Sequence, residues 1–175
     1  MDSGAVQVLT IAILTISDSR DETTDKSGAL LVSMVTEAGH HVIEKRIVPD
    51  NIYQIRAVVS QWIADPRVQV VVTTGGTGVT GRDSTPEAVL PLLDRELEGF
   101  GELFRWLSYE EIKTSCMLSR AIAGVANKTY VFCLPGSAGA CYTAWHKILK
   151  EQLNATHRPC NLAELIPRLD EHKHD

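Results

Sequence analysis

Apolar residues gather along this chain in four short runs rich in β-branched side chains, and each run predicts a β-strand. The runs at 8–17, 68–74 and 129–134 are almost continuously apolar, as is typical of strands covered on both faces. The run at 41–48 alternates apolar and polar residues, so we expect an edge strand there. The pattern therefore predicts a sheet of buried strands with one half-exposed edge.

Between the strand runs, apolar residues recur at helical spacing. This spacing predicts helices over 27–38 and 52–64, and Gly39 supplies a stop signal directly after the first. A further helix is predicted over 138–153, after the last strand run. Because strands and helices alternate, the chain is expected to form an α/β domain with a parallel sheet and helices on both faces.

The segment 84–125 carries no strong strand pattern and is expected to be mostly helical. The sequence STPE at 84–87 matches a capping box with proline in the first turn, so we expect a helix from there through Leu93. A second helical stretch is predicted over 100–107. Residues 118–125 are small and apolar, and are expected to pack against the sheet or another subunit.

Composition narrows the class of protein. The chain has 175 residues, 44% of them hydrophobic and 22% charged, which is ordinary for one soluble globular domain. Its net charge of −5 provides no basic surface for nucleic acid, and no run approaches the roughly 18 apolar residues of a membrane span. With no signal-peptide pattern and four cysteines lacking any CxxC pairing, we expect buried free thiols and a cytoplasmic protein.

The most informative polar segment follows the third strand run, where residues 73–83 read TTGGTGVTGRD. Residues 76–81 match the dinucleotide pattern G-x-G-x-x-G, but an ordinary Rossmann domain carries that pattern after its first strand. A phosphate-binding P-loop needs lysine and a hydroxyl residue where this chain has Arg82 and Asp83. The remaining interpretations are an anion-binding nest of glycine amides or a tight turn that needs glycine.

Three acids follow three predicted strands: Asp18, Asp50 and Asp83. Since the carboxyl ends of parallel strands meet at one edge, we expect these acids to converge there. Ser84 is expected to cap the following helix, which would leave Asp83 free for metal or proton chemistry. Asp50, considered by itself, is explained equally well as an ordinary N-cap of the helix that follows it. Mg²⁺ commonly takes one or two carboxylates plus substrate phosphates, so the acids favour a magnesium–triphosphate site.

Two further polar features lie near predicted strand ends. The loop at 134–139 is either a second anion nest or a plain turn in which Ser137 caps the last helix. Ser119 and Arg120 are polar within an apolar stretch, and Arg120 is expected either to clamp an anion or to form a structural ion pair. The six histidines form no metal-ligand pattern, and no Ser-His-Asp or Cys-His set is present.

Together these motifs resemble the MoaB/Mog family of molybdenum cofactor biosynthesis proteins. The segments that carry the resemblance are 15–19, 73–78, 83–87, 118–121 and 134–137, and those that resemble the MoaB branch are 95–102, 120–129 and 156–161. The resemblance spans residues 8–162, which we take as one molybdopterin-binding domain, and residues 163–175 are expected to form a flexible tail. It implies a three-layer α/β/α sandwich around a mostly parallel sheet.

The resemblance also implies a function, namely Mg-ATP-dependent adenylylation of molybdopterin before molybdate insertion. The alternative is a non-catalytic carrier of molybdopterin or an assembly subunit of the same pathway. It implies a homotrimer or homohexamer, and contacts with molybdopterin synthase or a molybdate-insertion protein, without nucleic acid or membrane partners.

The site residues implied by the resemblance fall into two groups. Asp50 and Asp83 match the family's catalytic acids and are expected to hold magnesium. Substrate and nucleotide binding is expected from Ser17, Asp18, Thr74, Gly75, Gly76, Thr77, Gly78, Ser119, Arg120, Pro135, Gly136 and Ser137. The hypothesis requires Asp50, Asp83 and Ser137 to line one pocket at the carboxyl ends of the strands.

Overall fold

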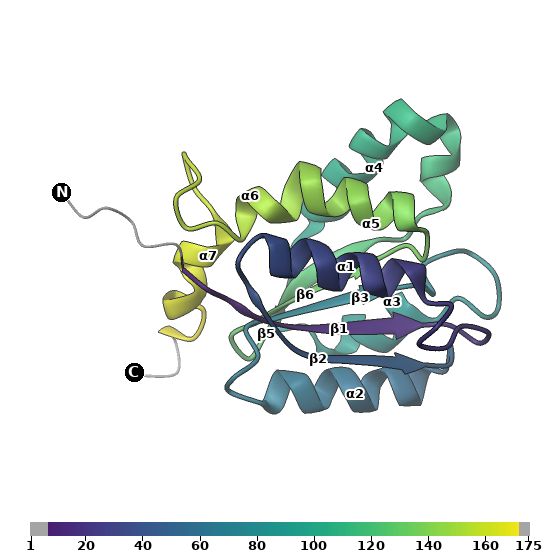
Figure 1. Cartoon of the computed structure of the whole chain (residues 1–175), viewed down its shortest axis with the longest axis horizontal. Coiled ribbons are helices and arrows are strands. Elements are labelled where there is room, and N and C mark those ends of the chain that lie inside the picture. The colour runs from purple at the N-terminus through teal and green to yellow at the C-terminus, as the bar shows by residue number, and fades with distance from the viewer. Residues whose placement is uncertain (1–6, 172–175) are drawn as a thin grey trace.

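The computed structural model describes residues 7–171, which form a central sheet between two layers of helices (Figure 1). The six strands are β1 (Thr10–Ile16), β2 (His41–Val48), β3 (Val70–Thr74), β4 (Arg95–Glu96), β5 (Ile122–Ala126) and β6 (Thr129–Leu134). Their order is β2-β1-β3-β6-β5-β4, so β2 lies at an edge as predicted. The strands β2, β1, β3 and β6 are parallel, while β5 runs antiparallel to both β6 and β4.

The helices match the apolar periodicity of the sequence. They are α1 (Lys26–Glu37), α2 (Ile52–Ala64), α3 (Thr85–Val89) with the 3₁₀ turn Leu90–Leu92, α4 (Glu98–Ile112) with the 3₁₀ segment Lys113–Leu118, α5 (Ala138–Ala144), α6 (Lys150–Gln152) and α7 (Leu162–Leu165). A π-helical turn, Trp145–Leu149, joins α5 to α6. Gly39 has a φ of +86° directly after α1, which confirms it as the residue that ends this helix.

Alternating side chains of the strands build two hydrophobic cores. In β1, Ile11 and Ile13 pack into the core beneath α1, α4 and α5, whereas Leu14 and Ile16 pack into the core beneath α2 and α3. Every residue of β3 and β6 is buried, as their continuous apolar runs predicted. The architecture is therefore the expected three-layer α/β/α sandwich with a mostly parallel sheet.

The segment around β5 differs from the prediction of a mostly helical middle region. Ala123, Gly124 and Val125 belong to a buried strand that forms a hairpin with β6. A Cβ on Gly124 would lie 2.5 Å from the carbonyl oxygen of Arg95, so small residues are needed where β4 and β5 pair. These small side chains weaken the apolar pattern. The signal for a hairpin was the turn, where Asn127 and Lys128 both have positive φ.

The C-terminal segment differs as well. Over 163–171, which was predicted to be a flexible tail, Ala163 and Ile166 are buried in the core beneath α1, and Asp170 pairs with Lys128 Nζ at 2.7 Å. Asn161 caps α7 by accepting a hydrogen bond from the Glu164 amide at 2.9 Å. The rest of the predicted tail, 172–175, lies outside the described residues.

Two further predictions concern the whole chain. The four cysteines are free, and Cys160 is the exposed one, so the expectation of buried thiols is correct for the other three. Within residues 7–171, the helices lack the length and apolar character that crossing a bilayer requires.

Candidate functional site at the carboxyl edge of the sheet

A cleft of about 570 Å³ opens where the loops after β1, β3 and β6 meet the end of α4. This volume is in the usual range for small-molecule sites. Most of the predicted site residues line it, namely Ser17, Gly75, Gly76, Thr77, Gly78, Asp83, Ser119, Pro135, Gly136 and Ser137. Asp18, Asp50, Thr74 and Arg120 do not.

The glycine loop after β3 needs glycine for two separate reasons. Gly75 and Gly76 have φ values of +106° and +69°, a region that side chains disfavour. A Cβ on Gly76 would lie 2.3 Å from Thr85 Oγ1, and one on Gly78 would lie 2.6 Å from Asp83 Oδ2. The loop is therefore a tight turn that needs glycine and also lines the cleft, and anion binding by its amides stays a prediction.

Asp83 lines the cleft, but its carboxylate is not free as predicted. Its Oδ2 accepts hydrogen bonds from the amide and the hydroxyl of Thr80, at 2.9 and 2.7 Å. These bonds, the Thr80 hydroxyl foremost, hold the pKa of Asp83 below its usual value, so the group is ionised near neutral pH. The expected capping box is wrong, because the Ser84 side chain caps no amide of α3.

Asp50 takes the role that Glu87 would have in a capping box, because it accepts from the amide of the N-cap residue. Its Oδ1 accepts from the amide of Ser84 at 3.1 Å and also from the Ser84 hydroxyl. Asn51, not Asp50, caps α2 by accepting from the amides of Tyr53 and Gln54. Asp50 is 8% exposed and lies behind Gly76, outside the cleft. The requirement that Asp50, Asp83 and Ser137 line one pocket is therefore not met, because Asp50 lies outside the cleft that Asp83 and Ser137 line.

Asp18 joins the acids at this edge from the end of β1. Its Oδ1 accepts a hydrogen bond from the Asp50 amide at 3.0 Å, and both oxygens accept from Arg82. The hydrogen bonds from Arg82 lower the pKa of Asp18. Two of the three acids therefore meet directly, and Asp50 reaches Ser84, the residue after Asp83; within residues 7–171 the three do not form a metal-binding cluster.

Arg120 serves the loop as a structural clamp. Its guanidinium donates to the carbonyl oxygens of Gly78, at 2.6 Å, and Asp83, at 2.8 Å, and pairs with Glu87. The structural alternative for Arg120 is therefore correct. Ser119 beside it does line the cleft, and its buried Oγ has no hydrogen-bond partner among the described residues.

The loop between β6 and α5 forms the opposite wall of the cleft. Ser137 caps α5 by accepting from the Ala140 amide at 3.1 Å, which is the plain-turn interpretation. Thr74 is fully buried and donates to the carbonyl of Pro135 at 2.9 Å, so it fastens this loop to the end of β3.

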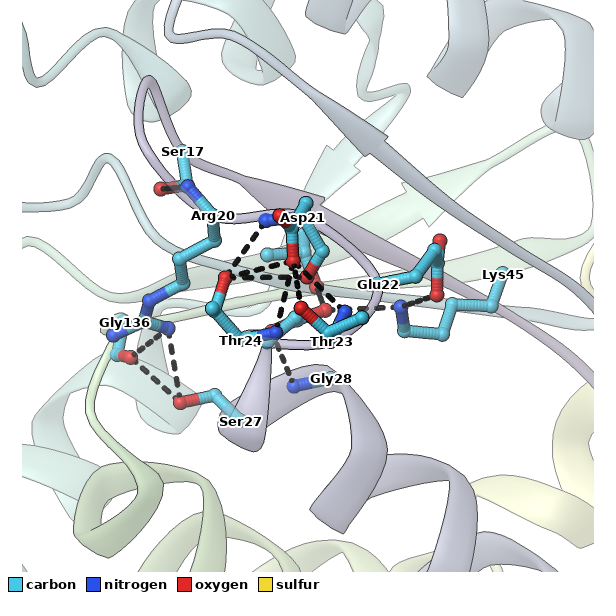
Figure 2. A network of polar contacts seen from close by, with 12 residues as sticks. Ser17, Arg20, Asp21, Glu22, Thr23, Thr24, Ser27, Gly28, Lys45 and Gly136 are labelled. Atoms are coloured by element: carbon cyan, nitrogen blue, oxygen red, sulfur yellow. Dashed lines mark hydrogen bonds and ion pairs between the residues drawn. The ribbon is translucent and has the colours of Figure 1, made fainter.

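Several cleft residues were missed by the sequence analysis. Arg20 reaches the cleft from the loop after β1, and Figure 2 shows its side chain extending towards Ser27 and Gly136. The other missed residues come mainly from α4, the 3₁₀ segment after it and α5: Ile16, Ser19, Phe104, Ser108, Glu111, Ile112, Ser115, Leu118, Gly139, Ala140 and Thr143. Most of them carry no local motif, because packing of α4 against α5 brings them to the site. Ile16, Ser19, Leu118 and Gly139 are different, since they lie in segments that the sequence analysis singled out.

The model of a protein family described as "Probable molybdopterin binding domain" matches residues 12–155. The chain belongs to this family. The match covers most of the chain and includes most of β1, the other five strands and the cleft loops. This places the protein in molybdenum cofactor biosynthesis and confirms the resemblance drawn from the motifs.

Members of the molybdopterin-binding family include relatives that are similar over nearly their whole length. The molybdenum cofactor biosynthesis protein B of Escherichia coli K12 is 61% identical over 151 residues, which are 86% of this chain and 89% of that protein. A crystal structure of a molybdenum cofactor biosynthesis protein B superposes with a TM-score of 0.86 at 44% identity, covering 96% of this chain and 99% of that one.

A more distant solved relative is the tungsten cofactor synthesizing protein MoaB from Pyrococcus furiosus. It superposes with a TM-score of 0.74 at 39% identity and covers 84% of this chain and 94% of that one. The arrangement of sheet and helices is therefore shared with both of these solved relatives.

The side chains of the cleft can be compared with the ligands that a magnesium ion requires. Among residues 7–171, no group of three acidic, histidine or cysteine side chains is arranged to hold a metal. Mg²⁺ can also be held by a single protein carboxylate when substrate phosphates provide the other ligands. The ionised carboxylate of Asp83 lines the cleft and can serve as that single ligand. The residues present therefore fit a magnesium that arrives with a phosphorylated ligand.

Proposed function

We propose that this protein transfers the adenylyl group of Mg-ATP to molybdopterin in the cleft at the carboxyl edge of the sheet. The observation that carries the proposal is one small-molecule cleft that joins an ionised carboxylate, Asp83, with the glycine loop 75–78. Family membership supports molybdopterin as the acceptor. Asp83 and the loop amides supply the two functions that phosphoryl chemistry needs, charge neutralisation and positioning.

The reaction needs no strong base. The terminal phosphate of molybdopterin is already an anion, so one of its oxygens attacks the α-phosphorus of ATP directly. A new phosphorus–oxygen bond forms, and the bond to the leaving pyrophosphate breaks. The protein's contribution is to align the two phosphates and exclude water, which accounts for a cleft without a catalytic histidine.

Two residues of the loop have amides to offer in that alignment. The Gly75 amide donates to the Leu134 carbonyl at 3.0 Å, and the Gly78 amide bonds to Asp83. The amides of Gly76 and Thr77 are therefore proposed to hold phosphate oxygens. Magnesium bound with ATP would be held by Asp83 and would neutralise phosphate charge. Asp50 acts as a positioning residue, because its bonds to Ser84 fix the residue next to Asp83.

The test is product formation. Purified protein incubated with molybdopterin and Mg-ATP should release pyrophosphate and yield adenylylated molybdopterin. Asp83→Asn should lose the activity by at least 100-fold, although asparagine keeps an oxygen that can accept from Thr80. Asp65→Asn removes an acid paired with Arg67, in the turn before β3 and far from the cleft, and should leave the rate unchanged. Absence of product with folded wild-type protein would refute the proposal.

A non-catalytic carrier or assembly subunit is the second candidate. It is favoured by the lack of a three-residue metal cluster within the described ranges and by the net charge of −5. In that case molybdopterin should bind while Mg-ATP shows no measurable affinity by calorimetry. Saturable Mg-ATP binding in the micromolar range would exclude this candidate.

We also propose that the chain assembles as a homotrimer or hexamer. Large apolar side chains stand exposed along α4 and the segment after it, including Trp106 at 69% and Met117 at 74% exposure. Sedimentation velocity measures the oligomer directly. A monomer at micromolar concentration would contradict the proposal. We further propose that the assembled protein contacts molybdopterin synthase or a molybdate-insertion protein.

A further inference from the structure

Arg20 crosses the end of a strand to reach the cleft. It leaves the loop after β1 and donates from Nη1 to the carbonyl of Gly136, after β6, at 3.0 Å. Since β1 and β6 flank β3 in the sheet, the guanidinium lies over the end of β3, beside the glycine loop. Nη1 also donates to Ser27 Oγ at 3.2 Å, and Ser27 in turn donates to the same Gly136 carbonyl at 2.7 Å.

The charge of Arg20 is not neutralised by the protein. Three other basic side chains near this edge pair with acids: Arg82 with Asp18, Lys45 with Asp25 and Glu22, and Arg120 with Glu87. Among residues 7–171, no carboxylate lies within 4.0 Å of Arg20. Arg20 is also the one basic side chain that lines the described part of the cleft.

Most of the hydrogen-bonding capacity of this guanidinium is unused. A guanidinium carries five N–H donors, and in Arg20 the bonds to described residues all come from Nη1. Nε and Nη2 are therefore left for a ligand. A partly buried cation with spare donors in a fork geometry matches an anion with several oxygens, and phosphate above all.

The backbone that carries Arg20 is held firmly (Figure 2). Ser17 Oγ accepts from the Arg20 amide at 3.1 Å, and Asp21 Oδ1 accepts from the amides and hydroxyls of Thr23 and Thr24. Behind this turn, the buried Asp25 caps α1 through the Gly28 amide at 2.9 Å. The arginine is thus positioned before any ligand arrives, which reduces the entropy cost of binding.

Asp25 also ties this turn to the sheet. It accepts from Thr15 Oγ1 of β1 at 2.6 Å and pairs with Lys45 Nζ of β2 at 3.0 Å. The loop that places Arg20 is therefore anchored to two strands and to the first turn of α1.

We propose that Arg20 binds a phosphate group of the ligand in the cleft, and that Ser27 is the positioning residue that aims its guanidinium. The proposal rests on the proposed function for the nature of the ligand, since both molybdopterin and ATP carry phosphate. It identifies a specificity residue: a ligand that lacks the phosphate leaves Arg20 as an unpaired, partly buried cation and binds more weakly.

The experiment compares two forms of one ligand. Molybdopterin, and molybdopterin whose phosphate has been removed with alkaline phosphatase, are titrated anaerobically into the full chain without ATP. Arg20→Gln should weaken binding of the phosphorylated form by roughly 10- to 100-fold, the range of a hydrogen bond to a charged group. It should leave the affinity for the dephosphorylated form unchanged, whereas Arg20→Lys keeps the charge and should recover part of the loss.

Two further variants sharpen the comparison. Arg67→Gln alters net charge by the same amount at an exposed residue paired with Asp65, in the turn before β3, and should change neither affinity. Ser27→Ala should reduce the preference for the phosphorylated form by a smaller factor than Arg20→Gln, because the guanidinium remains but is aimed less well. Unchanged preference in Ser27→Ala would remove Ser27 from the proposal.

The source of the phosphate is distinguished by a second titration with Mg-ATP and with inorganic pyrophosphate. A loss confined to molybdopterin assigns Arg20 to the pterin phosphate, and a loss confined to Mg-ATP assigns it to the nucleotide. If Arg20→Gln weakens both pterin forms equally, or changes no affinity at all, Arg20 does not bind phosphate and the inference falls.

These binding measurements are independent of turnover. If the wild-type protein selects the phosphorylated pterin through Arg20 but makes no adenylylated product, the proposed adenylylation is refuted and phosphate binding by Arg20 is upheld. If the wild-type protein makes product but the Arg20→Gln variant binds phosphorylated ligands normally, phosphate binding by Arg20 is refuted and the proposed adenylylation is upheld.

Discussion

The carboxylate of Asp50 accepts hydrogen bonds from both the amide and the hydroxyl of Ser84, a residue 34 positions further along the chain. This contact joins the loop after β2 to the start of α3 and passes behind the glycine loop. It gives the first turn of α3 the acceptor that a local side chain normally provides. An acid expected in the cleft is therefore part of the cleft's support.

Asp50→Ala should destabilise the fold by about 1–3 kcal/mol, because it leaves the partly buried amide and hydroxyl of Ser84 without an acceptor. Asp50→Asn retains one oxygen and should cost less. Urea unfolding measures both variants, with Asp65→Ala at an exposed ion pair as the control. An Asp50→Ala variant as stable as the wild type would show that the contact contributes nothing.

Gly76→Ala should reduce stability by about 2 kcal/mol or more and abolish ligand binding. An alanine there would adopt a φ of +69° and place its Cβ 2.3 Å from Thr85 Oγ1. Gly81→Ala is the matched control in the same loop, since a Cβ on Gly81 meets nothing within 4 Å. Equal melting temperatures for the two variants would contradict the strained geometry.

Thr80→Val should raise the pKa of Asp83 towards its ordinary value of 3.8, since the Thr80 hydroxyl is the foremost cause of its low pKa. Thr80→Ser keeps the hydroxyl and should leave that pKa low. Carbon-detected NMR titration of the Asp83 carboxyl measures the difference. We also expect Thr80→Val to lower the adenylylation rate several-fold by loosening the carboxylate. An unchanged pKa in Thr80→Val would disprove this coupling.

The stability of the protein should fall as the pH drops below about 6.5, because burial lowers the pKa of His40. Its Nδ1 accepts from the Leu9 amide at 3.1 Å, so the folded state holds the neutral imidazole. Below the unfolded pKa of 6.5, the unfolded chain binds a proton that the folded chain does not, and unfolding is favoured until the folded pKa is reached.

The measurement for His40 is the urea midpoint at pH 7.5 and pH 5.5. His40→Gln keeps an acceptor but cannot titrate, so it should lose part of the wild-type difference between the two pH values. His41→Gln, next to it and exposed, is the control and should behave as the wild type. If His40→Gln retains the full difference, another group is responsible.

Ile166→Ala should destabilise the protein by about 2–5 kcal/mol, since this side chain is buried in the core beneath α1. Leu165→Ala, at an exposed neighbour in the same helical segment, should change stability by less than about 0.5 kcal/mol. Thermal unfolding compares the two. Equal effects would mean that the C-terminal segment does not pack as the structure shows.

The sequence alone was enough to predict the elements that depend on local periodicity. Continuous apolar runs predicted β1, β3 and β6, and apolar spacing predicted α1 and α2 to within a residue. The edge position of β2 followed from its alternating pattern. The motifs also identified the family and most of the cleft loops, because glycines needed at positive φ recur there as a recognisable string.

The strand β5 and the C-terminal packing required the tertiary structure, because small residues and short helices carry little periodic signal. The same holds for the partners of polar groups. Ser84 has a local capping pattern, yet its hydroxyl donates to Asp50, since the sheet brings the two loops together. Arg20 gave no local signal at all. Its place over the end of β3 follows from a strand order that sets β1 and β6 on either side, which no local pattern encodes.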